Sequence, residues 1–340
     1  MIATKKHLPA FARLKGSCDV VAVCDVSQDV ARKIAGEYGI PNAYADLPTM
    51  LAEQKPDLVD ICTPPKTHAD VALKSIAGGA HVLIEKPMAM DVDECDRIIR
   101  AAEERGRKIC VAHSDLFYPS FRKMRALVES GSIGEFMGMR IFLSTPVDYI
   151  TSKPDHWAHK LPGGVIGETG PHVVYMTLAF LRPVREVHVV ASKRLDYAWS
   201  PYEDYRIELV GDKAVSSITC VYTTDQWAAQ VEVWGTRGIL KADLELMYVT
   251  RSRRTSLRPA HVGASGFAEA WQVVRDTLGT GVKVLGRRFE RTHDVLIAEF
   301  VRSIVEGKGS PVTADEGREA VRVMNLIAGQ LKGREAAPAR

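Results

Sequence analysis

Residues 58–87 read LVDICTPPKTHADVALKSIAGGAHVLIEKP, and this stretch decides the fold of the first half of the chain. The apolar run 58–62 stops at the turn Thr63-Pro64-Pro65, and the pattern predicts a helix over 67–77 that two glycines close. A second apolar run, 81–84, follows at once. Two buried strands joined by a helix form a parallel βαβ unit, because parallel strands need a crossover connection.

The same alternation continues on both sides of this unit. Residues 19–24 (DVVAVC) form a β-branched run that ends in Asp25, and a helix is predicted over 28–38. A further helix is predicted over 92–105 and a further strand over 109–112. The sequence therefore predicts an α/β fold with an N-terminal Rossmann-type, doubly wound parallel sheet, whose ligand site lies at the carboxyl ends of its strands.

The second half has a different pattern, with successive strand-like runs separated by short turns. This pattern predicts a C-terminal α+β domain with a large, mostly antiparallel open sheet. We expect a truncated dinucleotide-binding domain over 1–118, a substrate and oligomerisation domain over 119–332, and a flexible tail over 333–340. The predicted strands span 136–145, 184–193, 205–210, 214–223, 228–234 and 238–244, and the late helices span 293–306 and 314–331.

Bulk composition is typical of a folded, two-domain protein. Hydrophobic residues make up 46% and charged residues 26% of the 340 positions, and the formal net charge is +3. Because basic and acidic residues are interspersed, we expect no nucleic-acid partner. One basic run, Arg251 to Arg258, is interpreted either as a solvated loop or as a contact for a phosphate or carboxylate.

Cysteines and apolar runs indicate the compartment. The six cysteines show no CxxC spacing, so we interpret them as reduced thiols and predict neither a disulfide framework nor a zinc site. No apolar run reaches the length of a membrane span, and the N-terminus lacks the apolar stretch of a signal peptide. We therefore expect a cytoplasmic protein with no membrane partner.

Asp25 is the first candidate binding residue. At the end of a strand in the first βαβ unit, a carboxylate can accept hydrogen bonds from both hydroxyls of an adenosine ribose, and it repels a 2′-phosphate. This favours NAD over NADP. A surface aspartate that caps the next helix is the alternative interpretation.

A glycine-rich phosphate loop should precede such a unit, but Met1-Ile2-Ala3-Thr4 leads directly into a predicted helix. Ala3 fits the third small position of that fingerprint. Either the start codon was assigned too late, or the protein has lost its ability to bind the dinucleotide. The otherwise intact site favours a start codon assigned too late. The reading frame upstream of Met1 would distinguish the two.

Two further motifs lie at strand ends. In a nucleotide-binding sheet the turn that contains Thr63 and Pro64 faces the cofactor, with Thr67 as an expected helix cap. Glu85-Lys86-Pro87 follows the strand 81–84 directly, and a lysine at this position can reach into the crevice and take part in proton chemistry. A solvated lysine is the common alternative.

Glu168-Thr169-Gly170-Pro171-His172 lies in what we expect to be a loop that leads into a helix over 173–181. With this spacing Glu168 and His172 can lie on one side of a first helical turn. A carboxylate near an imidazole orients the ring for work as a general base. A capping glutamate with a buried structural histidine is the alternative. Metal binding has no convincing third ligand, so we predict no metal.

Taken together, these segments resemble the Gfo/Idh/MocA family, named for glucose-fructose oxidoreductase and inositol dehydrogenase. The resemblance covers nearly the whole chain, and the EKP tripeptide together with the acidic-x-Gly-x-His element makes it specific. The matching segments are His7 to Ala10, the strand ending in Asp25, Thr63 to Pro65 with His68, Glu85 to Pro87, Gly131 to Gly134, Gly163-Gly164, Glu168 to His172, and Gly235 to Gly238.

The resemblance implies roles for individual residues. Lys86 would hydrogen-bond the reacting hydroxyl and the nicotinamide ribose, and His172 would remove the hydroxyl proton. Glu168 stands where many members have aspartate, and it would orient His172 or hold a substrate hydroxyl. We expect further cofactor contacts from Ala3, Thr63, Pro64, His68, Glu85 and Trp157, and substrate contacts from His113 and Tyr118.

The resemblance also implies an open sheet that packs against the cofactor and often forms an oligomer interface, so we expect a homodimer or homotetramer. Departures from the family pattern are the missing glycine loop, Leu116 in place of a common arginine, and Tyr175 in place of a common aspartate. Residues 253–291 are assigned only to a helical insertion near the substrate pocket.

The expected activity is an NAD(P)-dependent dehydrogenase that acts on a hydroxyl carbon of a sugar, cyclitol or similar polyol. Two alternatives remain open from the sequence. One is a ligand-sensing or regulatory protein of the same fold without turnover, and the other is an NAD-assisted eliminase or glycosidase.

Overall fold

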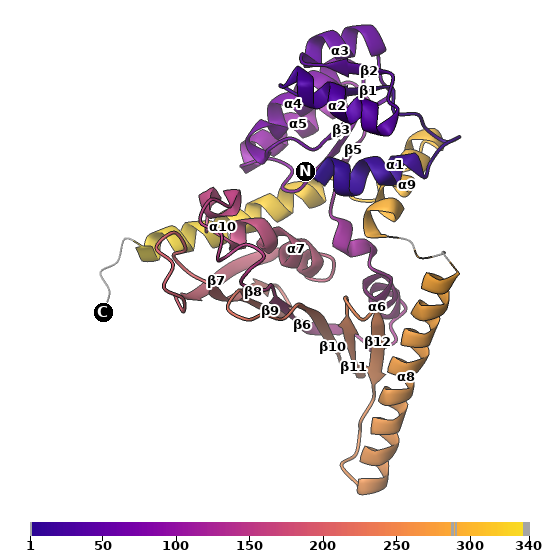
Figure 1. Ribbon diagram of the computed structural model, residues 1–340. Coiled ribbons are helices and arrows are strands. Elements are labelled where there is room, and N and C mark those ends of the chain that lie inside the picture. The colour runs from indigo at the N-terminus through magenta and orange to yellow at the C-terminus, as the bar shows by residue number, and fades with distance from the viewer. Residues whose placement is uncertain (1, 287–288, 290, 336–340) are drawn as a thin grey trace. The chain divides into compact units, whose positions relative to one another are not determined.

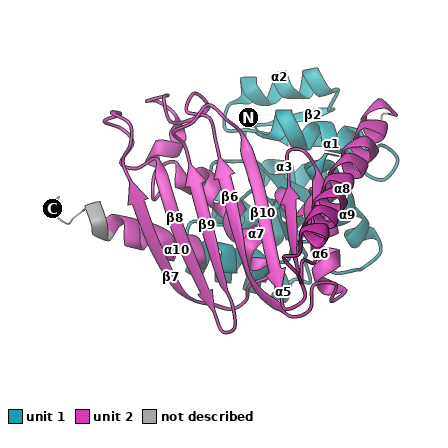
Figure 2. Ribbon diagram, turned by 90° about the horizontal axis from the view of Figure 1, so that it is seen from below, with its two compact units in different colours: residues 1–114, 290–322 teal, residues 115–289, 323–340 magenta. Residues whose placement is uncertain are grey.

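The computed structural model describes residues 2–286, 289 and 291–335, and the chain divides into two compact units (Figures 1 and 2). Unit 1 comprises residues 1–114 and 290–322, and unit 2 comprises residues 115–289 and 323–340. The domain boundary expected at 118–119 stays a prediction. The tail expected at 333–340 falls largely outside the described residues, since only 333–335 continue the last helix.

Unit 1 is built on short parallel strands in two sets, β1-β2 and β3-β4-β5. A doubly wound sheet of order 3-2-1-4-5-6 has its first strand at the centre. Here the two sets are separate sheets, and no described residue forms a strand that pairs with both β1 and β3. The strands are β1 (Ala22–Cys24), β2 (Asn42–Tyr44), β3 (Leu58–Ile61), β4 (His81–Ile84) and β5 (Ile109–Val111).

The helices of unit 1 begin and end where local chemistry dictates. The Ser27 hydroxyl accepts from the Val30 amide at the start of α2, and Gly39 ends that helix with a φ of 67°. Asp91 caps α5 in the same way. The helices are η1 (Ala3–His7), α1 (Leu8–Ala12), α2 (Gln28–Tyr38), α3 (Leu47–Gln54), η2 (Pro65–Thr67), α4 (His68–Ala77), α5 (Val92–Glu104), α9 (Thr292–Val305) and the first part of α10 (Ala314–Glu335).

Unit 2 is built on a seven-stranded sheet of order β12-β11-β10-β6-β9-β8-β7 within the described residues (Figure 2). All of its pairings are antiparallel except β6 with β9. Its strands are β6 (Phe136–Ser144), β7 (Val184–Ser192), β8 (Asp204–Gly211), β9 (Val215–Val221), β10 (Ala228–Gly235), β11 (Gly238–Asp243) and β12 (Tyr248–Ser252).

Helices accompany the sheet of unit 2. The largely buried α7 (Ile166–Leu178) packs on β6 and β9, and α6 (Pro119–Glu129) packs on β11 and β12. Short turns η3 (Ser114–Phe117) and η4 (Trp157–Lys160) precede α6 and α7, and α8 (Pro259–Leu285) lies along β12. Among the described helices, none combines the length and the apolar character needed to cross a membrane.

The predicted fold class is confirmed, with parallel strands in unit 1 and a mostly antiparallel sheet in unit 2. One local prediction was wrong. Glu168 to His172 lie inside α7 and not in a loop before it, because the helix begins at Ile166 and continues through Pro171. Pro171 is the sixth residue of α7, so it lacks the amide that would otherwise donate to the Gly167 carbonyl within the helix.

Candidate active site

His68 ties together the two turns that follow β3 and β4. Its buried ring has Nδ1 2.8 Å from the Pro87 carbonyl oxygen and Nε2 2.8 Å from the Thr63 carbonyl oxygen. Burial lowers the pKa of His68, which favours the neutral ring that donates one hydrogen bond at a time. A direct contact between His68 and a cofactor stays a prediction, and the geometry supports an indirect role through the two turns.

The turn after β3 leaves Thr63 and Pro64 exposed at the carboxyl edge of the strand. The Thr67 hydroxyl donates to the Pro64 carbonyl (2.8 Å), and it lies 2.9 Å from the Thr63 hydroxyl, from which it can accept. Thr67 therefore holds the turn and does not cap α4 with its side chain, contrary to our expectation. Cofactor contacts at Thr63 and Pro64 stay predictions.

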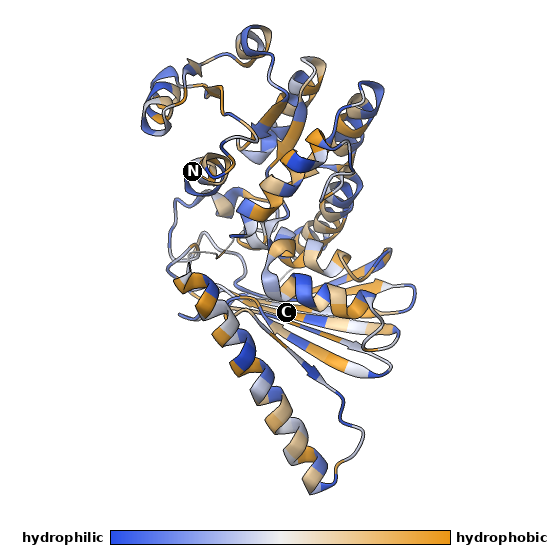
Figure 3. Cartoon of the chain, turned by 90° about the vertical axis from the view of Figure 1, so that its right-hand side faces the viewer, coloured by the Kyte–Doolittle hydropathy of each residue, from blue (hydrophilic) through white to orange (hydrophobic). Residues whose placement is uncertain are grey.

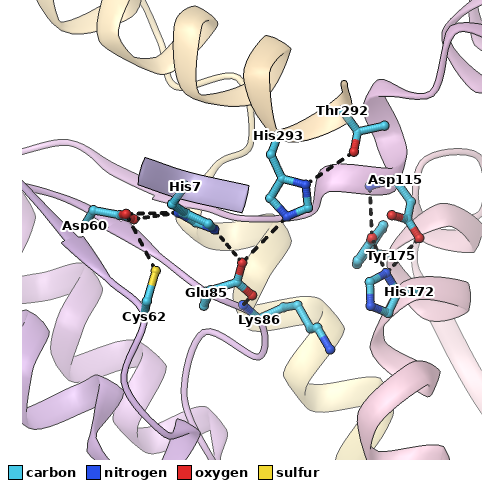
Figure 4. A network of polar contacts seen from close by, with 10 residues as sticks. All are labelled: His7, Asp60, Cys62, Glu85, Lys86, Asp115, His172, Tyr175, Thr292 and His293. Carbon is cyan, nitrogen blue, oxygen red and sulfur yellow. Dashed lines mark hydrogen bonds and ion pairs between the residues drawn. The ribbon is translucent and has the colours of Figure 1, made fainter. Parts of the chain in front are cut away.

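Glu85, at the end of β4, belongs to a buried ionic network around His7 (Figure 4). Glu85 Oε1 lies 2.8 Å from His7 Nε2, and Oε2 accepts from the Lys86 amide at 3.0 Å. The other ring nitrogen, His7 Nδ1, lies 3.0 Å from both carboxylate oxygens of Asp60. Since both ring nitrogens face carboxylates, both carry protons and His7 is an imidazolium.

Electrostatics within this network agree with that assignment. Burial alone would lower the pKa of His7, but the adjacent Asp60 charge and the hydrogen bonds to both carboxylates raise it well above its usual value. For Glu85, burial opposes ionisation, yet the hydrogen bond and charge of His7 lower the pKa to about 2. The Glu85 carboxylate therefore holds a structural cation, and a contact with a cofactor stays a prediction.

His7 also belongs to two groups of side chains with metal-ligating atoms. Its ring nitrogens lie within 4.8 Å of ligand atoms of Asp60 and Cys62, and of Glu85 and His293. A metal would have to replace a hydrogen bond that His7 already makes. Burial raises the pKa of Cys62 to about 12, so the thiol is protonated. An ion-pair network accounts for this cluster, and we assign no metal to it.

Asp25 follows β1 and is partly exposed. Its Oδ1 accepts from the Ser27 amide at 2.9 Å, while Oδ2 makes no hydrogen bond within the described residues. One carboxylate oxygen is thus held in place and the other is available to a ligand. Ala3 lies at the start of η1, and its cofactor contact stays a prediction.

In unit 2, His172 lies on α7 in a compact polar group (Figure 4). Its Nδ1 lies 2.7 Å from Asp115 Oδ2 and 2.7 Å from the Tyr175 hydroxyl oxygen. The Asp115 amide donates to that same hydroxyl at 3.1 Å, so aspartate, tyrosine and histidine form a closed triangle. The His172 side chain keeps 23% of its surface exposed.

This triangle fixes the chemistry of the His172 ring. A carboxylate can only accept, so the proton of a neutral His172 is on Nδ1, directed at Asp115. Nε2 then carries the lone pair, and it has no hydrogen-bond partner within the described residues. The ring therefore presents an available base that an anionic partner orients from behind, as in hydrolase triads.

Sequence spacing had assigned the orienting role to Glu168, but Asp115 holds that position. Asp115 stands 57 residues before His172, so no helical periodicity could connect them. Tyr175, noted in the sequence only as a departure from the family pattern, lies three residues after His172, a spacing that places two side chains on one helix face. Glu168 is partly exposed on the first turn of α7, and its substrate contact stays a prediction.

The other predicted contacts are spread over both units. His113 is buried after β5 in unit 1, and Tyr118 precedes α6 in unit 2. Burial raises the pKa of Tyr118, so its hydroxyl stays protonated. Trp157 is half exposed and stacks on His156 with ring centroids 5.8 Å apart, which excludes ordinary core packing. Contacts of His113, Tyr118 and Trp157 with substrate or cofactor stay predictions.

Comparison with known sequences gives the family. Residues 1–113 match the profile described as oxidoreductase family, NAD-binding Rossmann fold, and residues 121–241 match the GFO/IDH/MocA C-terminal domain. The chain belongs to the Gfo/Idh/MocA family. It is accordingly an oxidoreductase with an NAD-binding Rossmann domain, and the resemblance inferred from its motifs is confirmed.

Individual relatives are distant. The chain is 24% identical to the myo-inositol 2-dehydrogenase of Thermotoga maritima over 88% of its own length and 85% of that protein. An uncharacterized oxidoreductase of Rhizobium meliloti is 32% identical, over 43% of this chain and 44% of its own length, so the chain matches less than half of that relative. Levoglucosan dehydrogenase, solved in complex with NADH and levoglucosan, shares the fold with a TM-score of 0.81 at 17% identity, covering 98% of this chain and 95% of that chain.

The residues of unit 1 suit the two ends of NAD, the adenosine ribose and the nicotinamide. Asp25 offers an unengaged carboxylate oxygen at the carboxyl end of β1, and the turns after β3 and β4 lie at the carboxyl edge where such sheets bind ligands. Among the described residues, no glycine-rich turn is present between a strand and a helix to receive the pyrophosphate. Unit 1 would thus hold the ribose and the nicotinamide side through its own residues.

Proposed function

We propose that the chain is an NAD-dependent dehydrogenase that oxidises a hydroxyl-bearing carbon of a sugar, cyclitol or similar polyol, or reduces the corresponding ketone. The observation that carries this proposal is His172, whose Nδ1 is held by Asp115 at 2.7 Å while Nε2 has no partner among the described residues. A base prepared in this way suits removal of an alcohol proton near neutral pH.

The chain's own residues would divide the work as follows. His172 Nε2 accepts the hydroxyl proton, and Asp115 stabilises the imidazolium that forms. Lys86 donates a hydrogen bond to the same oxygen and stabilises its developing negative charge. Glu168 binds a neighbouring substrate hydroxyl. NAD, when bound, supplies the acceptor for the hydride that leaves the same carbon.

We further propose that the cofactor is NAD in preference to NADP. Asp25 Oδ2 can accept from a ribose hydroxyl, whereas a 2′-phosphate at that place would meet a carboxylate. Asp25→Ala should therefore weaken NAD binding about 10-fold and leave NADP binding unchanged or improved. Fluorescence titration of both cofactors measures this, and equal losses for the two would contradict the assignment.

A cytoplasmic location remains part of this proposal. The six cysteines are all unbridged, as expected for a reducing compartment. Among the named relatives, the substrates myo-inositol and levoglucosan are polyols or sugar derivatives, which supports the substrate class and no particular member of it.

A panel of cyclitols, aldoses and anhydrosugars, incubated with the protein and NAD, tests the activity. We expect NADH to accumulate in a one-to-one ratio with the oxidised product for at least one of them. Product without net NADH would favour the NAD-assisted eliminase or glycosidase. Ligand binding without any turnover, unchanged by Lys86→Ala and His172→Ala, would favour the sensor.

A further inference from the structure

Helix α8 (Pro259–Leu285) presents its apolar face to solvent and its polar face to the rest of unit 2. Apolar residues recur along its length (Figure 3) at steps of three and four, the spacing of one helical face. Phe267 is 82% exposed and Trp271 64% exposed. We define the outer stripe as Phe267, Trp271, Val274, Leu278, Val282 and Leu285, all of which are exposed.

The opposite, polar face of α8 covers β12, the edge strand of the sheet. The Gln272 side chain accepts from the Arg251 amide (2.9 Å) and donates to the Arg251 carbonyl (3.2 Å), as a neighbouring strand would. Asp276 accepts from the Val249 amide at 3.0 Å and pairs with Lys123 at 2.5 Å. These contacts satisfy the exposed peptide groups of β12 and leave the outer stripe without a partner in unit 2.

Alone, such a helix has little to stabilise it. None of its described residues is buried, and it contains Gly263, Gly266, Gly279 and Gly281, each of which costs about 1 kcal/mol relative to alanine. Helices in proteins draw most of their stability from packing an apolar face. The packing that α8 lacks within its own unit must come from outside it.

We propose that a second copy of this chain covers the outer stripe, with the two α8 helices packed against each other about a twofold axis. The stripe contains no charged residue, and α8 as a whole carries two basic and two acidic side chains. Two copies of the helix would therefore not repel each other electrostatically. The same neutrality argues against an anionic lipid surface, which selects helices rich in lysine and arginine.

The available area fits a stable dimer. Phe267 to Leu285 spans about 27 Å of helix. Each of its two aromatic side chains can bury about 150–250 Å², and a specific interface takes about 800 Å² from each partner. The two matched family ranges end before α8, at residues 113 and 241, so the helix adds a surface that the family profiles do not describe.

A matched pair of double variants tests the proposal by light scattering after size exclusion. Trp271→Glu with Leu278→Glu places two charges in the outer stripe. Ala270→Glu with Thr277→Glu adds the same charges one residue earlier, on an exposed part of the helix outside the stripe. We expect the wild-type chain and the control to share one mass, and the stripe variant to show half of it while it still unfolds in a cooperative transition.

A gentler substitution keeps the test valid if the charged variant misfolds. Trp271→Ala adds no charge, and its loss should weaken self-association about 10-fold to 100-fold in sedimentation equilibrium. A monomeric wild-type chain would overturn the proposal. A second comparison uses Phe142→Glu with Val190→Glu, at exposed positions of the open sheet. If this sheet variant has half the wild-type mass while the stripe variant keeps the full mass, the proposal is overturned. The proposal would also be overturned if the wild-type chain and the control sediment with anionic vesicles and the stripe variant does not.

Discussion

Two histidines, one in each unit, show how surroundings decide what an imidazole can do. His7 is fully buried and lies between Asp60 and Glu85, so each ring nitrogen already has a carboxylate. His172 keeps 23% of its side chain exposed and gives only Nδ1 to Asp115. The first ring is saturated and can only stabilise the fold, whereas the second retains a lone pair for chemistry.

The comparison shows that a carboxylate beside a histidine is not evidence of catalysis by itself. What distinguishes the two sites is whether the second nitrogen is also occupied. A substitution at His7 should therefore change stability, and a substitution at His172 should change turnover. A His7 variant that loses only turnover, or a His172 variant that loses only stability, would contradict this distinction.

The largest expected effect is on turnover at His172. His172→Ala removes the base, and kcat should fall by about 10²–10⁴-fold, measured as NADH formation with a substrate from the panel. The unfolding free energy should change by less than about 1 kcal/mol, because the ring is partly exposed. Retained turnover would remove His172 from the proposed mechanism.

Next in size is the loss of stability at His7. His7→Gln leaves the buried Glu85 carboxylate and the partly buried Asp60 carboxylate without their cation, which should lower the unfolding free energy by about 3–5 kcal/mol in urea titrations. His188→Gln is the matched control, since His188 pairs with Glu186 at 3.3 Å but is 62% exposed. A surface pair of this kind contributes little, so equal losses in both variants would contradict the assigned role of His7.

The pH dependence of stability follows from the same network. The pKa of Glu85 is lowered to about 2 in the folded chain from a usual value of 4.5, so its contribution is present above pH 4.5 and is lost as the pH falls toward 2. His7 has the opposite sign, since its raised pKa gives stability that is lost as the pH rises through the raised value. Between pH 4.5 and 2, Glu85→Gln should flatten the slope of unfolding free energy by up to about 1.4 kcal/mol per pH unit. If the Glu85→Gln variant shows a slope as steep as that of the wild-type chain, the Glu85 carboxylate is not the origin of this pH dependence.

A smaller effect is expected at Asp115. Asp115→Asn keeps the size of the side chain but loses the charge that orients and stabilises the ring, so kcat should fall by up to about 100-fold. The KM for the substrate should stay nearly unchanged, which a general loss of structure would not produce. Asp148→Asn, at an exposed aspartate of the same unit, serves as the control and should leave both unchanged.

Much of the fold could be predicted because local signals are strong at element ends. Helix α2 has the predicted bounds, Gln28–Tyr38, since Ser27 caps it and Gly39 closes it. Strand β4 also has the predicted bounds, His81–Ile84. By contrast, β2 (Asn42–Tyr44) has only three partly exposed residues, too few to show a period, and it was not predicted.

The candidate site was only half visible in the sequence. Lys86 and His172 stand in recognisable motifs, but the partners of His7 and His172 come from segments 53, 57 and 78 residues away. Such pairings depend on how β3, β4 and η3 are brought together with distant helices, and no periodicity records that. The polar face that α8 turns toward β12 is equally invisible, because periodicity identifies a stripe but not its neighbour.

Strands β1 and β3 each have a ladder partner on one side only within the described residues, and this has a practical consequence for handling the protein. Unpaired peptide groups on a strand edge recruit extended segments from other molecules. Concentrated samples should therefore precipitate through β-sheet growth, visible as rising thioflavin fluorescence. A short β-branched peptide added in excess should slow that loss by pairing with these strand edges first.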